Sequence, residues 1–103
     1  ENLKLLWQLY QKRDLVNPVC IVDTNHANSD KQYQEQPRIV QEVLHSRRLS
    51  PEIRQLVKGF MIESYLVEGC QDVGDHVYGR SITDACLGWQ ESRELVLSIA
   101  NQV

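Results

Sequence analysis

Residues 19–30 read VCIVDTNHANSD, an apolar run that changes within one residue into a dense polar cluster. The run at residues 19–22 is short, continuous and rich in β-branched side chains, which is typical of a strand buried on both faces, as in a parallel sheet. The cluster places Asp23 and His26 directly after the end of that strand. Such a cluster is either an ordinary turn or the start of a functional site, and its spacing alone leaves both interpretations open.

The same change from apolar to polar recurs later in the chain. Residues 59–62, GFMI, form a second candidate for a buried strand, and Glu63 follows them at once. Between the two runs, Pro37 precedes apolar residues at helical spacing, and Arg47 and Arg48 lie where that helix would end. The sequence therefore predicts a strand, a helix and a second strand, with polar side chains after each strand.

Helical patterns also lie at both ends of the chain. Apolar residues at i, i+3, i+4 and i+7 predict a helix over residues 2–12, and a last helix is expected over residues 90–101. Ser50, Pro51 and Glu52 are suited to capping one further helical turn. The segment at residues 64–88 is expected to be irregular, and a loop of that length is usually functional. The residues expected to face inward from the last helix are Leu95, Val96 and Ile99.

This order of elements predicts an α/β protein whose two parallel strands are joined by a right-handed crossover and flanked by helices. Two parallel strands cannot cover their own faces and edges, so we expect the chain to be part of a larger fold or to form a homo-oligomer. Trp7 and Tyr10 are expected near such an interface. The apolar residues expected to lack sufficient cover are Leu3, Leu6, Trp7, Val40, Leu44, Leu95 and Ile99.

The composition excludes several classes of protein. With 42% hydrophobic and 24% charged residues, residues 1–103 fit one soluble globular unit. The net charge is −3 and the basic residues are scattered, which argues against binding to nucleic acid. Apolar runs of about four residues are far shorter than the roughly 20 that span a membrane, and no signal peptide is evident. Cys20, Cys70 and Cys86 lack CxxC spacing, which favours reduced thiols and a cytoplasmic location.

Parallel strands place the residues that follow them at one edge of the sheet, where α/β proteins bind ligands. Neighbouring strands lie about 4.8 Å apart, so His26 and Glu63 can reach one shared point. An imidazole and a carboxylate suit a divalent metal, and either Asp84 or Asp23 could supply a third ligand. By contrast, His45 is expected to be a solvated residue of a helix. His76 lies in a glycine-containing loop with no fixed partner, and no phosphate loop, serine nucleophile elbow or HExxH motif is present.

Three longer motifs carry a resemblance to a known family. They are IVDTNHANSDKQ at residues 21–32, MIESYLVEGCQ at residues 61–71 and YGRSITDACLGW at residues 78–89. In this order they closely resemble the C-terminal part of type I 3-deoxy-D-arabino-heptulosonate-7-phosphate synthase, also called phospho-2-dehydro-3-deoxyheptonate aldolase. The resemblance covers nearly all of this chain but only the end of the family's chain. It implies the C-terminal βαβα portion of a TIM (β/α)8 barrel, with the seventh and eighth strands and the closing helix.

The resemblance also implies an activity and a set of ligands. The family condenses phosphoenolpyruvate with erythrose 4-phosphate in the shikimate pathway, releases phosphate and requires a divalent metal such as Mn, Fe, Zn or Co. Matching the motifs residue by residue makes His26, Glu63 and Asp84 the metal ligands, with His26 and Asp84 also counted as catalytic residues. The metal would act as a Lewis acid on the aldehyde or would activate a water, and both roles stay open.

The differences from the family concern residues outside these motifs. The family's fourth metal ligand is a cysteine in a glycine-proline-cysteine motif, which this sequence lacks, and Cys20, Cys70 and Cys86 are not its equivalents. The arginine and lysine residues that bind the substrate phosphates in the family are also missing. We therefore expect a C-terminal fragment that is inactive by itself. The alternative is a free-standing, non-catalytic module for metal binding or oligomerisation.

Overall fold

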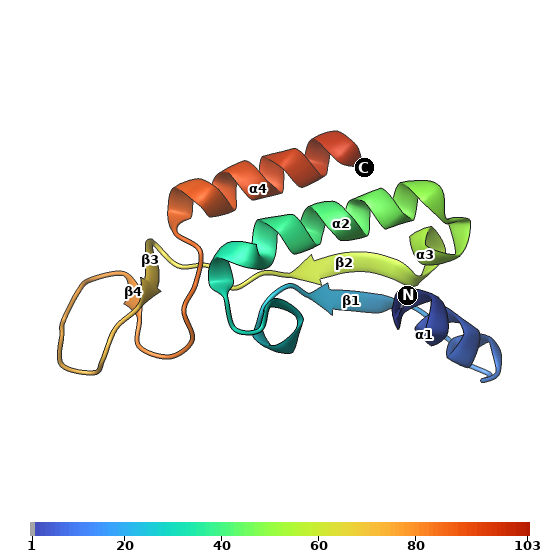
Figure 1. Cartoon of the computed structure of the whole chain (residues 1–103), viewed down its shortest axis with the longest axis horizontal. Coiled ribbons are helices and arrows are strands. Elements are labelled where there is room, and N and C mark those ends of the chain that lie inside the picture. The colour runs from blue at the N-terminus through green and yellow to red at the C-terminus, as the bar shows by residue number, and fades with distance from the viewer. Residues whose placement is uncertain (1) are drawn as a thin grey trace.

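The computed structural model describes residues 2–103 and contains four α-helices, four strands and two short 3-10 helices (Figure 1). The elements in chain order are α1 (Asn2–Gln11), β1 (Cys20–Asp23), η1 (His26–Ser29), η2 (Tyr33–Glu35), α2 (Gln36–Leu49), α3 (Pro51–Leu56), β2 (Val57–Met61), β3 (Val67–Cys70), β4 (Arg80–Ser81) and α4 (Trp89–Gln102). The α-helices lie close to the predicted ranges. Ser50 caps α3, since its hydroxyl accepts a hydrogen bond of 3.3 Å from the backbone N–H of Ile53.

The two predicted strands form the main sheet. β1 and β2 pair in parallel, with Val22 opposite Phe60 and Asp23 opposite Met61. Their arrowheads point to the same end of the molecule in Figure 1, and α2 and α3 provide the connection between them. The parallel α/β arrangement predicted from the sequence is therefore confirmed.

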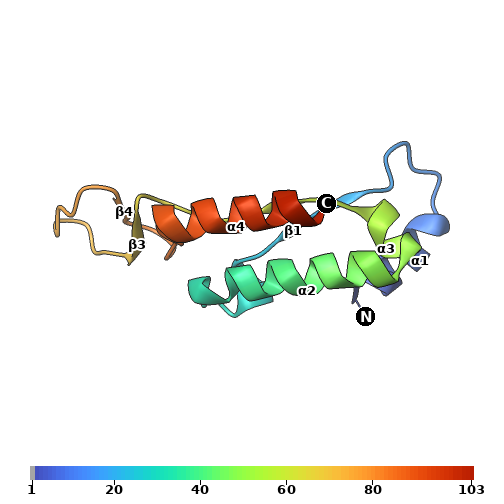
Figure 2. The same ribbon diagram turned by 90° about the horizontal axis from the view of Figure 1, so that it is seen from above.

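α2 and α4 form a layer on one face of this sheet, and α1 and α3 lie at the end where the strands begin (Figure 1). α2 and α4 run side by side in both views (Figures 1 and 2), and α1 packs near α3 at the opposite end from α4's first turn. Half-buried Val22 and Phe60 pack against the buried helical residues. The expectation that Val40, Leu44 and Leu95 lack cover is wrong, because these side chains are buried where α2 and α4 meet.

The opposite face of the sheet is bare. Ile21 is 67% exposed and Met61 is 48% exposed, whereas their neighbours Val22 and Phe60 contact the helices. The expectation that the first strand is buried on both faces is therefore wrong for this chain, because residues 2–103 provide a helical layer on one side only. The outward position of Val96 on α4, 58% exposed, likewise differs from its expected inward position.

The long segment after Glu63 is more regular than its sequence suggests. β3 and β4 form a second parallel pair, and isolated bridges join Ser64 to Leu87 and Gly69 to Cys86. These contacts fold residues 64–88 back on themselves, so that Leu87 is fully buried beside α2 and α4. The segment therefore returns to the strand ends before α4 begins. No helix within residues 2–103 is long and apolar enough to cross a membrane.

Candidate metal centre

The polar cluster after β1 forms a tight turn that presents His26 at the end of the sheet. His26 has a φ of 56°, in the left-handed region that non-glycine residues seldom adopt. The side-chain amide of Asn28 donates a hydrogen bond of 2.7 Å to the carbonyl of Asp23, which closes the turn. Strain of this kind persists where surrounding contacts fix the backbone, and it is common at functional sites.

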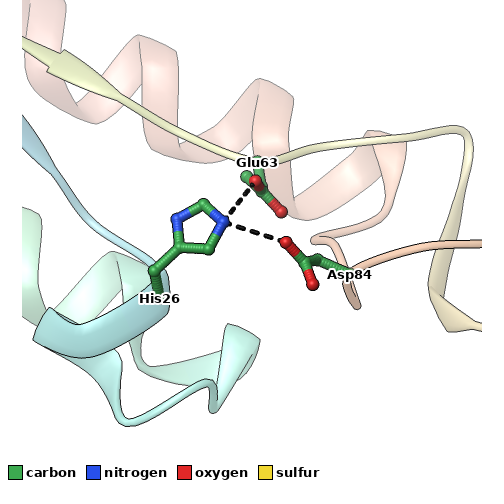
Figure 3. A group of neighbouring side chains, drawn as sticks. All are labelled: His26, Glu63 and Asp84. Carbon is green, nitrogen blue, oxygen red and sulfur yellow. Dashed lines mark hydrogen bonds and ion pairs between the residues drawn. The ribbon is translucent and has the colours of Figure 1, made fainter.

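Three predicted residues meet at this point. His26 Nε2 lies 3.0 Å from Glu63 Oε1 and 2.9 Å from Asp84 Oδ2, as the dashed lines in Figure 3 show. One ligand atom from each of the three lies within 4.8 Å of the others. Glu63 follows β2 and Asp84 comes from the segment before α4, so the three side chains arrive from different parts of the fold.

Asp23 lies on the other side of the imidazole ring. Its Oδ2 is 2.8 Å from His26 Nδ1, and its Oδ1 accepts a 2.9 Å hydrogen bond from the backbone N–H of Asn25. Of the two candidates for a third ligand, Asp84 therefore shares the Nε2 side with Glu63. Asp23 instead orients the ring, in the way that carboxylates support metal-binding histidines.

The electrostatics of the cluster favour a positive charge at its centre. The pKa of His26 is raised, first by its hydrogen bond to Asp23, then by its bond to Asp84 and by the nearby negative charges. Because an ionised Asp23 can only accept, Nδ1 carries a hydrogen and Nε2 is left facing two carboxylates. Nε2 must either hold a proton or share another cation with them.

The donor set fits a divalent metal. Metal bonds to nitrogen and carboxylate oxygen of about 2.0–2.2 Å allow two ligand atoms to lie about 3 Å apart. The separations of 2.9 and 3.0 Å at Nε2 match that spacing. The three side chains are also partly exposed, so an ion can reach them.

Two buried polar residues of the centre have no counterpart in the sequence-based prediction. Asn25 donates to Glu63 Oε2 and to the carbonyl of Ala85, both at 3.3 Å, and Gln36 hydrogen-bonds the backbone of Glu63. A signal for Gln36 does exist in the sequence. It occupies an inward position of the helical pattern that continues at Ile39 and Val40, where an apolar residue is usual.

The remaining candidates lie away from the centre or beside it. His45 is exposed on α2, as expected, and His76 is exposed in the loop between β3 and β4. All three cysteines are free thiols. Cys86 is buried with Sγ 4.0 Å from Glu63 Oε2, and burial, followed by the charge of Glu63, raises the pKa of its thiol. The raised pKa favours the neutral thiol form of Cys86 beside the cluster.

The fold and the cluster define a parallel α/β chain with a histidine and two carboxylates at the carboxyl ends of its strands. This is the edge at which α/β proteins place ligand-binding and catalytic groups. Residues 3–97 match the model of the DAHP synthetase I family. The chain belongs to this family, which confirms the resemblance seen in the three motifs.

Individual relatives agree with this assignment. The chain is 42% identical over 89 residues to the phospho-2-dehydro-3-deoxyheptonate aldolase of Haemophilus influenzae, covering 84% of this chain and 24% of that protein. It is 38% identical over 86 residues to the Phe-sensitive phospho-2-dehydro-3-deoxyheptonate aldolase of Escherichia coli K12, covering 81% of this chain and 24% of that protein.

A solved structure is similar as well. The phospho-2-dehydro-3-deoxyheptonate aldolase from Francisella tularensis SCHU S4 superposes with a TM-score of 0.73 at 30% identity. The match covers 82% of this chain and 24% of that chain. This chain therefore spans about a quarter of the length of the relatives that it matches.

Proposed function

We propose that residues 1–103 form a single unit that supplies the C-terminal βαβα portion of a (β/α)8 barrel in a phospho-2-dehydro-3-deoxyheptonate aldolase. Family membership and the 24% coverage of each relative support this assignment. The bare sheet face supports it too, because strands of such a barrel carry helices on the outside and pack side chains within. In this interpretation Ile21 and Met61 point toward the barrel interior.

The proposed reaction is the condensation of phosphoenolpyruvate with erythrose 4-phosphate, an aldol-type transfer in aromatic amino acid biosynthesis. We propose that a divalent metal is bound by His26, Glu63 and Asp84. We also propose that the protein is located in the cytoplasm. When bound, the metal would supply Lewis-acid chemistry for the aldehyde of the substrate or would activate a water. Residues that hold the substrate phosphates are not identified in this chain, so we expect it to be inactive by itself.

The chain's own residues prepare the centre for this role. Asp23 fixes the ring of His26 and keeps a hydrogen on Nδ1, so that the lone pair of Nε2 is directed toward Glu63 and Asp84. Glu63 and Asp84 contribute two negative charges that offset those of a divalent ion. Asn25 holds the second oxygen of Glu63 and so limits its rotation.

The observation that carries this proposal is the contact of His26 Nε2 with two carboxylates from separate segments. Titration calorimetry with Mn²⁺, Zn²⁺ or Co²⁺ tests it. We expect His26→Ala to abolish measurable binding, because the imidazole joins Glu63 and Asp84 at the centre. His45→Ala serves as a matched control, since it removes an exposed imidazole from α2 and should bind like the wild type. Equal binding by all three proteins would place the ion elsewhere and contradict the proposal.

A further inference from the structure

We propose that Gln36 is a positioning residue of the metal centre, whose side-chain amide fixes the backbone of Glu63 and thereby the carboxylate opposite His26. The inference rests on the proposed metal-binding function of this centre. Gln36 is the first residue of α2 and is fully buried. It touches none of the charged groups that we assign to the ion, and it acts through Glu63.

Gln36 forms a two-point clamp on Glu63. Its Oε1 accepts a 2.9 Å hydrogen bond from the backbone N–H of Glu63, and its Nε2 donates a 2.9 Å bond to the carbonyl of the same residue. The last paired residues of the main sheet are Asp23 and Met61, so Glu63 lies beyond the ladder and has no partner on β1. The amide of Gln36 replaces that missing partner with a donor and an acceptor at the required spacing.

The clamp also connects Glu63 with the two other parts of the centre. Thr24, which follows β1, has its hydroxyl 2.8 Å from Gln36 Oε1 and 3.0 Å from the carbonyl oxygen of Met61. The carbonyl of Glu63 accepts a second hydrogen bond of 3.0 Å from the backbone N–H of Leu87, three residues after Asp84. Gln36 therefore lies where the segments that carry His26, Glu63 and Asp84 are joined.

A role limited to packing would not require an amide at this position. An apolar side chain of similar volume would fill the same space, whereas a buried amide is unfavourable unless its groups are paired. Both ends of the Gln36 amide are paired, and two of the bonds are to the backbone of a single proposed ligand. Partners of ligand residues set the orientation of the donor atoms and thereby affect metal affinity.

The test is Mn²⁺ titration of Gln36→Met, which keeps the length of the side chain and removes both hydrogen-bonding groups. We expect affinity to fall about 10–100-fold, the range found when outer-shell partners of metal ligands are replaced. Val43→Ala is the matched control, since it removes buried volume from the same face of α2 without contacting the centre. The control should keep its Mn²⁺ affinity within about twofold of the wild type, even if its melting temperature falls as much as that of Gln36→Met.

A double variant separates positioning from general destabilisation. If Gln36 acts through the Glu63 carboxylate, adding Gln36→Met to Glu63→Ala should lower Mn²⁺ affinity by no more than about twofold. A full, additive loss in the double variant would overturn the proposal, as would an unchanged affinity in Gln36→Met. Should Gln36→Met fail to fold, Thr24→Val removes one hydroxyl that faces the clamp. It is then expected to weaken binding about two- to tenfold, and no change would contradict the inference.

His26→Ala keeps the two hypotheses distinguishable. If His26→Ala binds Mn²⁺ like the wild type, the proposed metal centre itself is wrong. If His26→Ala loses binding while Gln36→Met retains it, the centre stands and only the role of Gln36 is refuted.

Discussion

The end of the β1–β2 pair and the bare face of the same sheet differ in which side chains they bury and which they expose. At the strand end, polar side chains of Thr24, Asn25 and Gln36 are buried to 3% exposure or less, and each has hydrogen-bond partners within the chain. On the bare face, apolar Ile21 and Met61 are 67% and 48% exposed. The chain thus buries polar groups at one place and leaves apolar groups in solvent at another.

This difference shows which functions are local to the chain. Buried polar groups are unfavourable unless they are paired, so the strand end must be held by contacts already present in these residues. An apolar face has no directional requirement and can be covered by any complementary surface. The arrangement of the candidate centre is therefore encoded within this chain, whereas the cover of the sheet depends on what lies against it.

The largest change in the free energy of unfolding is expected from Asn25→Ala, at the polar strand end. The substitution removes the donor to Glu63 Oε2 and to the carbonyl of Ala85, and it leaves the hydroxyl of Ser29 without its 2.7 Å acceptor. Leaving buried groups unpaired costs about 1–3 kcal/mol each, so we expect a marked loss in the free energy of unfolding. Urea denaturation followed by circular dichroism measures it.

A matched control for Asn25→Ala is Asn28→Ala, which changes an exposed amide in the same turn that makes a single hydrogen bond to Asp23. We expect it to cost less, about 0.5–1.5 kcal/mol, because water can satisfy the freed carbonyl. Equal losses from both substitutions would mean that the burial of Asn25 adds nothing to the stability contributed by its hydrogen bonds. The claim that the buried polar groups hold the strand end together would then be wrong.

The sequence predicted most of the fold and part of the centre. The apolar runs, each followed closely by a carboxylate (Asp23 and Glu63), are enough to predict two parallel strands with ligand-binding side chains at their carboxyl ends. The clamp of Gln36 could not be predicted in the same way, because a hydrogen bond between residues 27 apart depends on how the helix docks on the sheet. The pairing of β3 with β4 was missed because strands this short, four and two residues, carry little periodic signal.

A smaller effect is expected from a change of pH, which alters the apparent Mn²⁺ affinity through the protonation of His26. The pKa of His26 is raised above the ordinary value of 6.5 by Asp23, then by Asp84 and the nearby charges. A metal must displace the proton from Nε2, so apparent Mn²⁺ affinity should fall about tenfold for each pH unit below that raised pKa. Calorimetry across a pH series measures the slope.

The metal-free protein should respond to pH in the opposite sense. A raised pKa in the folded state means that protonated His26 stabilises the fold fully below pH 6.5, and that this contribution is lost as pH rises through the folded pKa. Stability without metal should therefore decline over that window. His26→Ala should abolish the decline, whereas a decline that persists in the variant would assign it to other groups.

The smallest effect is expected on the bare face. Ile21→Thr keeps a β-branched side chain, which preserves strand propensity, and shortens a side chain that is already 67% exposed. If the face is open in solution, the free energy of unfolding should change by no more than about 0.5 kcal/mol, as at ordinary surface positions. Val22→Thr is the control on the covered face, where the same kind of change introduces a hydroxyl among core residues and should cost more.

Light scattering on the same variants measures their mass in solution and shows whether copies of the chain associate through the bare face. The sequence predicts a homo-oligomer, and the bare face offers a more exposed apolar surface for association than Trp7 and Tyr10, which are half-buried against the core. If copies associate through this face, Ile21→Thr should shift the protein toward monomer and lower its stability, and the loss should be larger at high protein concentration than at low concentration. A loss above about 1 kcal/mol without any change in mass would mean that Ile21 is covered by this chain itself, and the contrast between the two regions would not hold.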